Sequence, residues 1–308
     1  MGVLTLQTIL DGVQLGSIYA LVALGYTMVY GIVKLINFAH GDIIMVGAYF
    51  ALFSIPVLER MGLPIWLCIL VAGLLCAVLG MLIETIAYKP LRKAPKLCSI
   101  ITAIGMSLFL QNMALLLWSA SPQSFIKVFS TTTAISLFQD SPNEFVRHYF
   151  GLQLSTNAIL TIVVSLALMC GMQFFVKFSK SGRAMRCVSE DMGAAKLMGI
   201  NVNRTITMTF AIGSALAAVG SVFWSNSYPV IDPTMGSMLG LKAFIAAVLG
   251  GIGIIPGAIL GALIIGLAES ITKTYNSQLA DAIVFGILII ILLIKPAGIL
   301  GKNTKVKV

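Results

Sequence analysis

Long apolar runs, separated by short polar stretches, repeat along the whole chain. A helix that crosses the hydrocarbon core of a bilayer needs about 20 mostly apolar residues. Runs close to that length cover residues 6–33, 37–57, 64–88, 98–119, 155–177, 205–228, 236–252, 256–273 and 280–296. The pattern predicts an all-α fold, a polytopic membrane helix bundle of about eight to ten segments that forms one domain over residues 1–308.

The segments at 236–252 and 256–273 are short, and the stretch that joins them is rich in glycine. The residues concerned are Gly251, Gly253, Pro256, Gly257 and Gly261. Non-helical backbone at membrane depth is tolerated where protein or a wet cavity surrounds it, so a pair of half-helices is one interpretation. A tight hairpin between two full spans is the other. The four-residue spacing of Gly253, Gly257 and Gly261 also predicts one helical face on which another backbone packs closely.

Composition supports the membrane assignment. Of the 308 residues, 58% are hydrophobic and 10% are charged, whereas soluble domains carry about 25% charged residues. Such a chain has too little polar surface to cover a water-exposed globule, which excludes a soluble enzyme. The net charge of +9 could indicate nucleic-acid binding, but the positions of the charges indicate orientation in a lipid membrane instead, with no nucleic-acid partner.

Lysines and arginines are concentrated in alternate loops. Most of them lie around residue 34, at 89–96, at 177–204 and after residue 295. The loops between these hold few. Because positively charged loops remain in the cytoplasm, we expect the carboxyl terminus inside the cell and the amino terminus outside.

Two polar segments are longer than a turn. Residues 120–154 are expected to form a periplasmic loop, and residues 178–204 a cytoplasmic one. In the second segment, Ser189 predicts an N-cap and Gly199 a left-handed C-cap, with a helix over 190–198 between them. That helix would expose a short apolar stripe, which is typical of a docking surface. The stripe consists of Ala194, Leu197 and Met198.

Ionisable residues inside the apolar segments are candidates for function, because a charge in a bilayer is costly. Lys242 lies within a predicted span and is expected to reach a carboxylate, with Asp232 and Glu269 as the nearest candidates. Glu84 is expected to pair with Lys89 or to extend to the membrane interface.

Signatures of catalysis are absent from the sequence. The phosphate-binding pattern GxxxxGK[ST] does not occur, and the nearest stretch, Gly298 to Lys302, has the wrong spacing. The two histidines, His40 and His148, lie far apart, which argues against a histidine metal site. We expect no enzymatic activity, no cofactor and no metal. If the chain takes part in energised transport, the energy must come from another subunit or from an ion gradient.

Several motifs match a known family along nearly the whole chain. They are Gly12–Gly31, Asn37-Phe-Ala-His-Gly41, Ala87–Arg92, Gly182–Cys187, Glu190–Asn201 and Gly250-Gly-Ile-Gly-Ile-Ile-Pro-Gly-Ala258. With these motifs, the chain resembles the LivH-type permease subunits of bacterial branched-chain amino acid ABC transporters.

The resemblance implies an importer of several subunits in the bacterial inner membrane. Its partners would be a second homologous permease of the LivM type, two cytoplasmic ATPase subunits of the LivG and LivF type, and a periplasmic protein that delivers leucine, isoleucine or valine. ATP hydrolysis would take place on the ATPase subunits.

The resemblance also implies roles for particular residues. The ATPase-docking loop of such permeases corresponds here to Glu190, Ala194 and Gly199, with Arg183 in the preceding motif. In this sequence, Asp191 and Met192 replace two alanines of the fuller pattern. The cargo has an aliphatic side chain and zwitterionic ends, so we expect a mostly apolar path with a few polar groups. The candidates for those polar groups are Asn37, His40 and Lys242.

Other functions share part of this pattern. Related permeases for urea, short amides or other amino acids are one alternative, because the choice of cargo depends largely on the binding protein. An ion-coupled secondary transporter would also contain broken helices and buried charges, but a single-chain carrier does not need a cytoplasmic docking segment. An intramembrane hydrolase would need a paired nucleophile and base, which the sequence lacks.

Overall fold

The computed structural model describes residues 5–34, 37–129, 133–137, 149 and 151–301. Within these residues, every predicted apolar segment is helical. The helices are α1 (Leu6–Val33), α2 (His40–Arg60), α3 (Cys68–Ile83), α4 (Lys96–Trp118), α6 (Thr156–Phe178), α7 (Lys180–Glu190), α8 (Met192–Leu197), α9 (Val202–Ser227), α10 (Met235–Gly250), α11 (Ile255–Tyr275) and α12 (Leu279–Ile294). Seven of the described helical segments are long and apolar enough to cross a membrane, and α10 and α12 are shorter apolar helices. The prediction of a polytopic helical membrane protein is confirmed.

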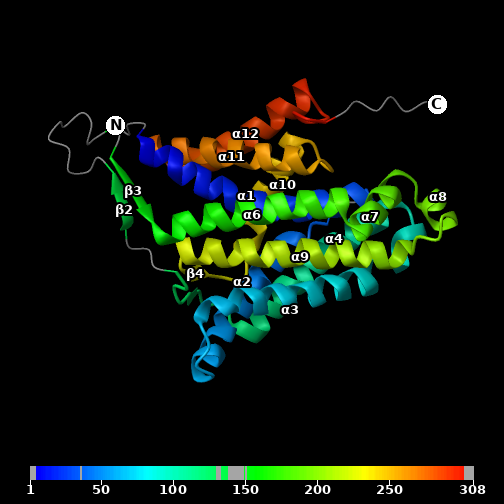
Figure 1. The fold of residues 1–308 in the computed structure, drawn as a ribbon, viewed down its shortest axis with the longest axis horizontal. Helices are drawn as coiled ribbons and strands as arrows, with labels where there is room; N and C mark the ends of the chain where they lie inside the picture. Colours follow the sequence, from blue (N-terminus) through cyan, green and yellow to red (C-terminus); the bar gives the residue numbers. More distant parts are fainter. Residues whose placement is uncertain (1–4, 35–36, 130–132, 138–148, 150, 302–308) are drawn as a thin grey trace.

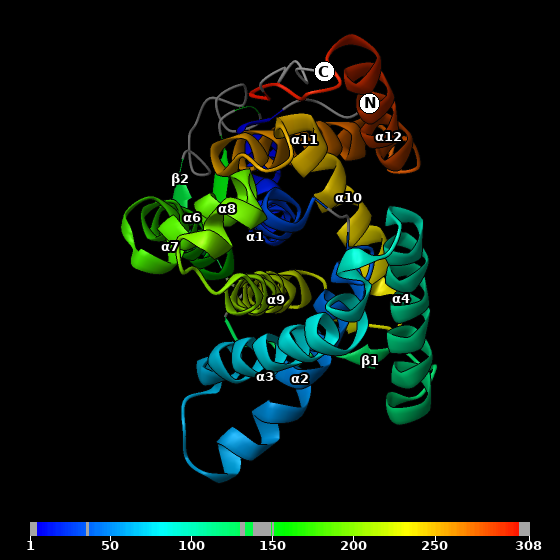
Figure 2. The ribbon, with the colours of Figure 1, turned by 90° about the vertical axis from the view of Figure 1, so that its right-hand side faces the viewer.

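The long helices lie side by side, and α1 is at the centre (Figures 1 and 2). It packs against α6, α9, α10 and α11. Of the most apolar part of α1, 83% is buried, compared with 17% in α4 and in α6. The helices α4 and α6 therefore present apolar side chains outward, as expected for a surface in contact with lipid.

The bundle has two distinct ends, which Figure 1 shows at left and right. The first, the strand end, holds two short antiparallel strand pairs, which are an addition to the predicted helical fold. They are β1 (Gln123–Ser124) with β4 (Val230–Ile231), and β2 (Thr133–Leu137) with β3 (Leu152–Ser155). The second, the α7 end, holds α7 and α8.

The charged loops separate between these two ends as the alternation predicted. Lys34, Arg186 and Pro296 line one cleft at the α7 end, and Arg92 reaches Asn203 at the start of α9. Lys273, in contrast, lies near the amino-terminal part of α1 and the carboxyl end of α9. The described parts of the loops assigned to the cytoplasm are thus at one end of the molecule.

The glycine-rich stretch forms a tight turn between α10 and α11. Gly251 and Gly253 have φ values of 108° and 94°, a region that favours glycine, and Pro256 stands in the first turn of α11. A Cβ atom on Gly257 would lie 2.4 Å from the carbonyl oxygen of Gly250, and one on Gly261 would lie 2.1 Å from that of Ala246.

The backbones of α10 and α11 therefore approach closely at Gly257 and Gly261, whereas Gly253 lies in the turn and is not on their helical face. The turn lines a cleft at the α7 end of the bundle, so the geometry fits the hairpin interpretation. With 16 residues, α10 has a length of about 24 Å and is shorter than a hydrocarbon core of about 30 Å.

Candidate functional site

The polar segment at the α7 end forms two helices, and the prediction of one helix over 190–198 with Ser189 as its cap is wrong. Ser189 lies inside α7, where its hydroxyl donates to the carbonyl of Arg186 at 2.7 Å. The break comes at Asp191, whose Oδ1 accepts from the backbone N–H groups of Gly193 at 2.7 Å and Ala194 at 3.0 Å. A carboxylate accepting two N–H groups is a strong N-cap, so α8 begins after Asp191.

The helix α7 is fixed to the bundle by its own cap and by one buried side. The Ser179 hydroxyl accepts from the N–H of Gly182 at 2.9 Å, and a Cβ atom on Gly182 would lie 2.3 Å from the carbonyl oxygen of Phe175 in α6. Met185 and Val188 are buried on the same side. Arg183 and the terminal Glu190 are exposed.

Beyond α7, the segment presents an apolar tip. Gly199 has a φ of 80°, which confirms the predicted left-handed C-cap. Leu197 is 90% exposed and Met198 is 82% exposed. Ala194 is exposed as well, whereas its neighbour Ala195 is buried. The predicted apolar stripe is therefore present, on α8 and the residue after it.

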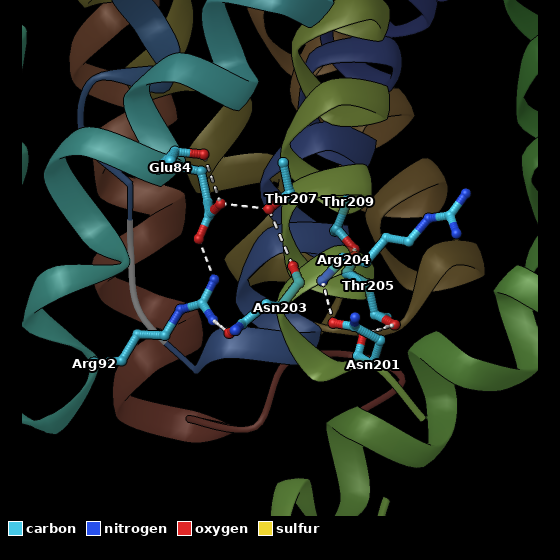
Figure 3. A network of polar contacts seen from close by, with 9 residues as sticks. Glu84, Arg92, Asn201, Asn203, Arg204, Thr205, Thr207 and Thr209 are labelled. Atoms are coloured by element: carbon cyan, nitrogen blue, oxygen red, sulfur yellow. Dashed lines mark hydrogen bonds and ion pairs between the residues drawn. The ribbon is translucent and has the colours of Figure 1, made fainter. Parts of the chain in front are cut away.

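A network of polar contacts links α3 to the start of α9 (Figure 3). Glu84 is fully buried and forms an ion pair with Arg92. The hydroxyl of Thr207 donates to the second carboxylate oxygen of Glu84 at 2.6 Å, and Arg92 also donates to the side-chain oxygen of Asn203. The prediction that Glu84 pairs with Lys89 is wrong, because a π-helical turn over Glu84–Tyr88 and a 3₁₀ turn over Pro90–Lys93 carry Arg92 back toward the carboxylate.

Sequence reasoning missed Arg92, Asn203 and Thr207 as parts of a site. Arg92 lies in one of the motifs that carry the family resemblance, and that was the available signal. Asn201 marks the beginning of α9, since its Oδ1 accepts from the N–H of Arg204 at 3.0 Å. The network therefore ties α3 to the helix that directly follows α8.

Asn37 and His40 lie together inside the bundle, where α2 begins. Asn37 is 3% exposed and His40 is 2% exposed, and both line a small cavity with Tyr26 and Phe244. The side-chain oxygen of Asn37 accepts from the Tyr88 hydroxyl at 2.7 Å. Among the described residues, Asn37 Nδ2 and His40 Nε2 have no hydrogen-bond partner.

Lys242 belongs to a second buried polar group, which reaches α1 at Tyr19. Its Nζ lies 2.8 Å from Glu269 Oε1 and 2.7 Å from Asp281 Oδ1. Glu269 is fully buried and also contacts Lys273 at 2.8 Å and the Tyr19 hydroxyl at 2.6 Å. The predicted pairing of Lys242 with Glu269 is confirmed, whereas Asp232 is not its partner and hydrogen-bonds to Thr234 instead.

Metal-ligating side chains do not cluster in the described part of the chain: no group of three or more His, Cys, Asp or Glu residues could hold an ion there. His148 lies outside the described residues.

The central helix, the buried ion pairs and the segregated charged loops define a multi-pass helical membrane protein with an ordered segment at one end. The family described as "branched-chain amino acid transport system / permease component" matches residues 8–293. The chain therefore belongs to this family of transport permeases.

Individual relatives agree with the family match along nearly the full length. The chain is 40% identical to the high-affinity branched-chain amino acid transport system permease protein LivH of Escherichia coli (strain K12), over 98% of this chain and 97% of the relative. It is 43% identical to BraD of Pseudomonas aeruginosa, over 98% of both chains. It is 25% identical to LivM of E. coli, over 94% of this chain and 69% of the relative.

Proposed function

We propose that this chain is a permease subunit of an ATP-driven importer that moves leucine, isoleucine and valine across the bacterial inner membrane. Near full-length identity to LivH and BraD, which are named for branched-chain amino acid transport, supports the cargo. The LivM match shows that a second, more distant permease shares the family, and it supports a pair of homologous permeases. Two ATPases would bind on the cytoplasmic side, and a periplasmic protein would deliver the cargo on the other.

The single observation that carries the ATPase assignment is the exposed tip at Leu197 and Met198. With Ala194 they form a contiguous exposed apolar patch on a folded segment, and such a patch indicates a binding surface. The tip lies at the α7 end, where the lysine-rich and arginine-rich loops gather, and this end is cytoplasmic under the positive-inside rule. The carboxyl terminus is then also cytoplasmic, and residues 120–154 lie in the periplasm.

The proposed docking segment, residues 178–204, is ordered enough to transmit a displacement. The caps at Ser179, Asp191 and Asn201 each hold a helix start, so movement of the tip is passed to α9 and not absorbed by a flexible loop. The proposed cycle is alternating access, in which closure of the ATPases on ATP shifts the permease pair between two arrangements. Glu190, Ala194, Gly199 and Arg183 are proposed as the coupling residues.

The proposed path contains Asn37 and His40, because a zwitterionic cargo needs polar partners inside an apolar bundle. Both side chains are buried, and each has a polar atom without a hydrogen-bond partner in the described part of the chain. Lys242 has two carboxylates as partners, so we place it beside the path, where it holds α10 against α11 and α12.

Substitution of the tip tests the docking role. Leu197→Asp places a charge in an interface that would otherwise bury an apolar side chain worth about 1.5–3 kcal/mol. We expect the ATPases to be lost on copurification and leucine uptake to fall at least tenfold, while the periplasmic protein still binds leucine. Leu197→Met is the matched control, since it keeps the apolar surface. Full uptake and copurification in Leu197→Asp would reject the docking role.

Two further changes test coupling without altering the apolar tip. Gly199→Val forces a branched side chain into a left-handed conformation, and Glu190→Ala removes a charge at the end of α7. Both should reduce uptake and the ATP hydrolysis coupled to it. Normal rates in both variants would contradict the coupling assignment.

Reconstitution separates the alternatives. Membrane vesicles that hold the complete complex should take up leucine, isoleucine and valine only with ATP and the binding protein present. Uptake by the purified chain alone, driven by an ion gradient, would favour a secondary transporter. Stronger uptake of urea or short amides than of leucine would favour the related importers.

A further inference from the structure

A cleft at the α7 end has a composition that the docking role does not explain. It has a volume of about 460 Å³ and lies between the carboxyl end of α1, the inner side of α7 and the turn from α10 to α11. This volume is in the range of small-molecule sites, about 300–1,000 Å³. One wall, α7, belongs to the coupling segment, and the opposite wall belongs to the packed core.

Two positively charged side chains line the cleft, and one of them, Arg186, also donates to the backbone carbonyl of Lys177 at 3.0 Å. Lys34 and Arg186 line it, and Lys34 forms no ion pair among the described residues. The amino-terminal end of α11 enters the same cleft through Gly253, Ile254 and Ile255. None of the described side chains caps this helix start, so its free N–H groups favour an anion.

A buried polar atom points independently to a ligand. Thr27 lines the cleft and is 1% exposed, and its Oγ1 has no hydrogen-bond partner among the described residues. Buried hydroxyl groups nearly always have a partner. A bound molecule that accepts from this hydroxyl would provide one.

The remaining lining residues indicate the other chemical features of the bound ligand. Glu190 supplies a negative charge that suits an ammonium group, and Met28, Met185 and Ile252 supply apolar surface. The cleft thus holds positive groups for a ligand carboxylate, a negative group for a ligand ammonium and an apolar wall. This combination matches a free amino acid with an aliphatic side chain.

We propose that this cleft binds a zwitterionic aliphatic amino acid from the cytoplasmic side and that the bound molecule slows the transport cycle. The ligand contacts α7 and the core together, so it stabilises the one arrangement in which both walls are near each other, and a ligand shifts an equilibrium by its preference for one state. The inhibitory consequence rests on the proposed function of α7 in coupling, whereas the binding site itself does not.

The test uses the complete complex in vesicles whose ATPase subunits face outward, with the binding protein and leucine sealed inside. Leucine is added to the outer solution, and ATP hydrolysis is measured. We expect external leucine to lower the rate, while isocaproate, which lacks the ammonium group, isoamylamine, which lacks the carboxylate, and glycine do so far less. Thr27→Val and Lys34→Met should each raise the half-inhibitory leucine concentration about tenfold relative to their own uninhibited rates. Lys89→Met, an exposed lysine at the same end and outside the cleft, should behave as the unmodified complex.

A rate unaffected by external leucine, or inhibition that is the same in all three variants, would overturn the regulatory part of the proposal. Amide hydrogen exchange on the solubilised complex then decides the binding part, because leucine should slow exchange in residues 28–34, 185–190 and 252–257 even if coupling through α7 fails. No protection in these segments would overturn the site. ATP hydrolysis before external leucine is added reports the proposed transport function separately.

Discussion

The ion pair between Glu84 and Arg92 gives a sharp test of the structure, because sequence reasoning and the structure name different partners for Glu84. Arg92→Met removes the cation that the structure places against the buried carboxylate. Lys89→Met removes the cation that the sequence favoured. The first change should destabilise the protein and the second should not.

The magnitude follows from burial. Removing one partner of a buried ion pair costs about 3–5 kcal/mol, but the Arg92 side chain is 17% exposed, so solvent already weakens the pair. Thr207 remains as a donor to the carboxylate. We therefore expect Arg92→Met to lower the free energy of unfolding by about 2–3 kcal/mol, within the range for hydrogen bonds to charged groups. For a chain of 308 residues, that loss corresponds to a decrease in Tm of about 3–5 °C.

The double variant Glu84→Gln with Arg92→Met separates lost attraction from an uncompensated charge. It removes both charges, so it should recover at least half of the loss in Tm caused by Arg92→Met. Thermal unfolding of the purified chain in detergent, followed by tryptophan fluorescence, measures all variants. Lys89→Met should remain within about 0.5 kcal/mol of the unmodified chain. A larger loss in Lys89→Met than in Arg92→Met would refute the assigned network.

Three other predictions are measured by expression, thermal unfolding or uptake. Gly261→Val should prevent α10 and α11 from packing and abolish stable expression, since its Cβ would lie 2.1 Å from a backbone oxygen. Gly105→Val, with open space around its Cβ, should express normally, and equal expression of the two variants would contradict the close approach. Asp191→Ala should lower the free energy of unfolding by about 1 kcal/mol through loss of the α8 cap, and it should reduce uptake. Asp191→Asn keeps a capping oxygen and should retain most of the stability and the uptake. If Asp191→Asn is as impaired as Asp191→Ala, the charge matters more than the cap. Lys242→Met should lower Tm by several degrees because it leaves buried Glu269 with fewer cations, and adding Glu269→Gln should recover part of that loss. An unchanged Tm in Lys242→Met would mean that the ion pair contributes nothing to stability.

The positions of the membrane helices could be predicted well from the sequence, because a span is defined by the length of an apolar run and little else. All the predicted segments are helical, with boundaries that differ by a few residues. The pairing of Lys242 with Glu269 could also be predicted, since a buried lysine has few carboxylates within reach in such a chain.

The details of the docking segment could not be predicted in the same way. Ser189 and Asp191 are both good caps by residue type, and what decides between them is that Met185 and Val188 of α7 pack on the bundle and extend the first helix past Ser189. The partner of Glu84 depends on a π-helical turn followed by a 3₁₀ turn. These departures from α-helical geometry rotate Arg92 and Lys89 relative to the carboxylate, and no periodicity in the sequence indicates them.

The helix α9 runs without interruption from Val202 to Ser227, a length of roughly 39 Å at 1.5 Å per residue. At one extremity its Asn203 side chain holds Arg92, and at the other Asn226 holds the backbone of Phe129. One continuous helix thus makes contacts at both the α7 end and the strand end of the bundle. In the proposed alternating-access cycle, a displacement at the α7 end would pass along α9 to the strand end without an intervening hinge. The two ends would then not open at the same time, and the rigidity of this one helix would limit leakage across the membrane.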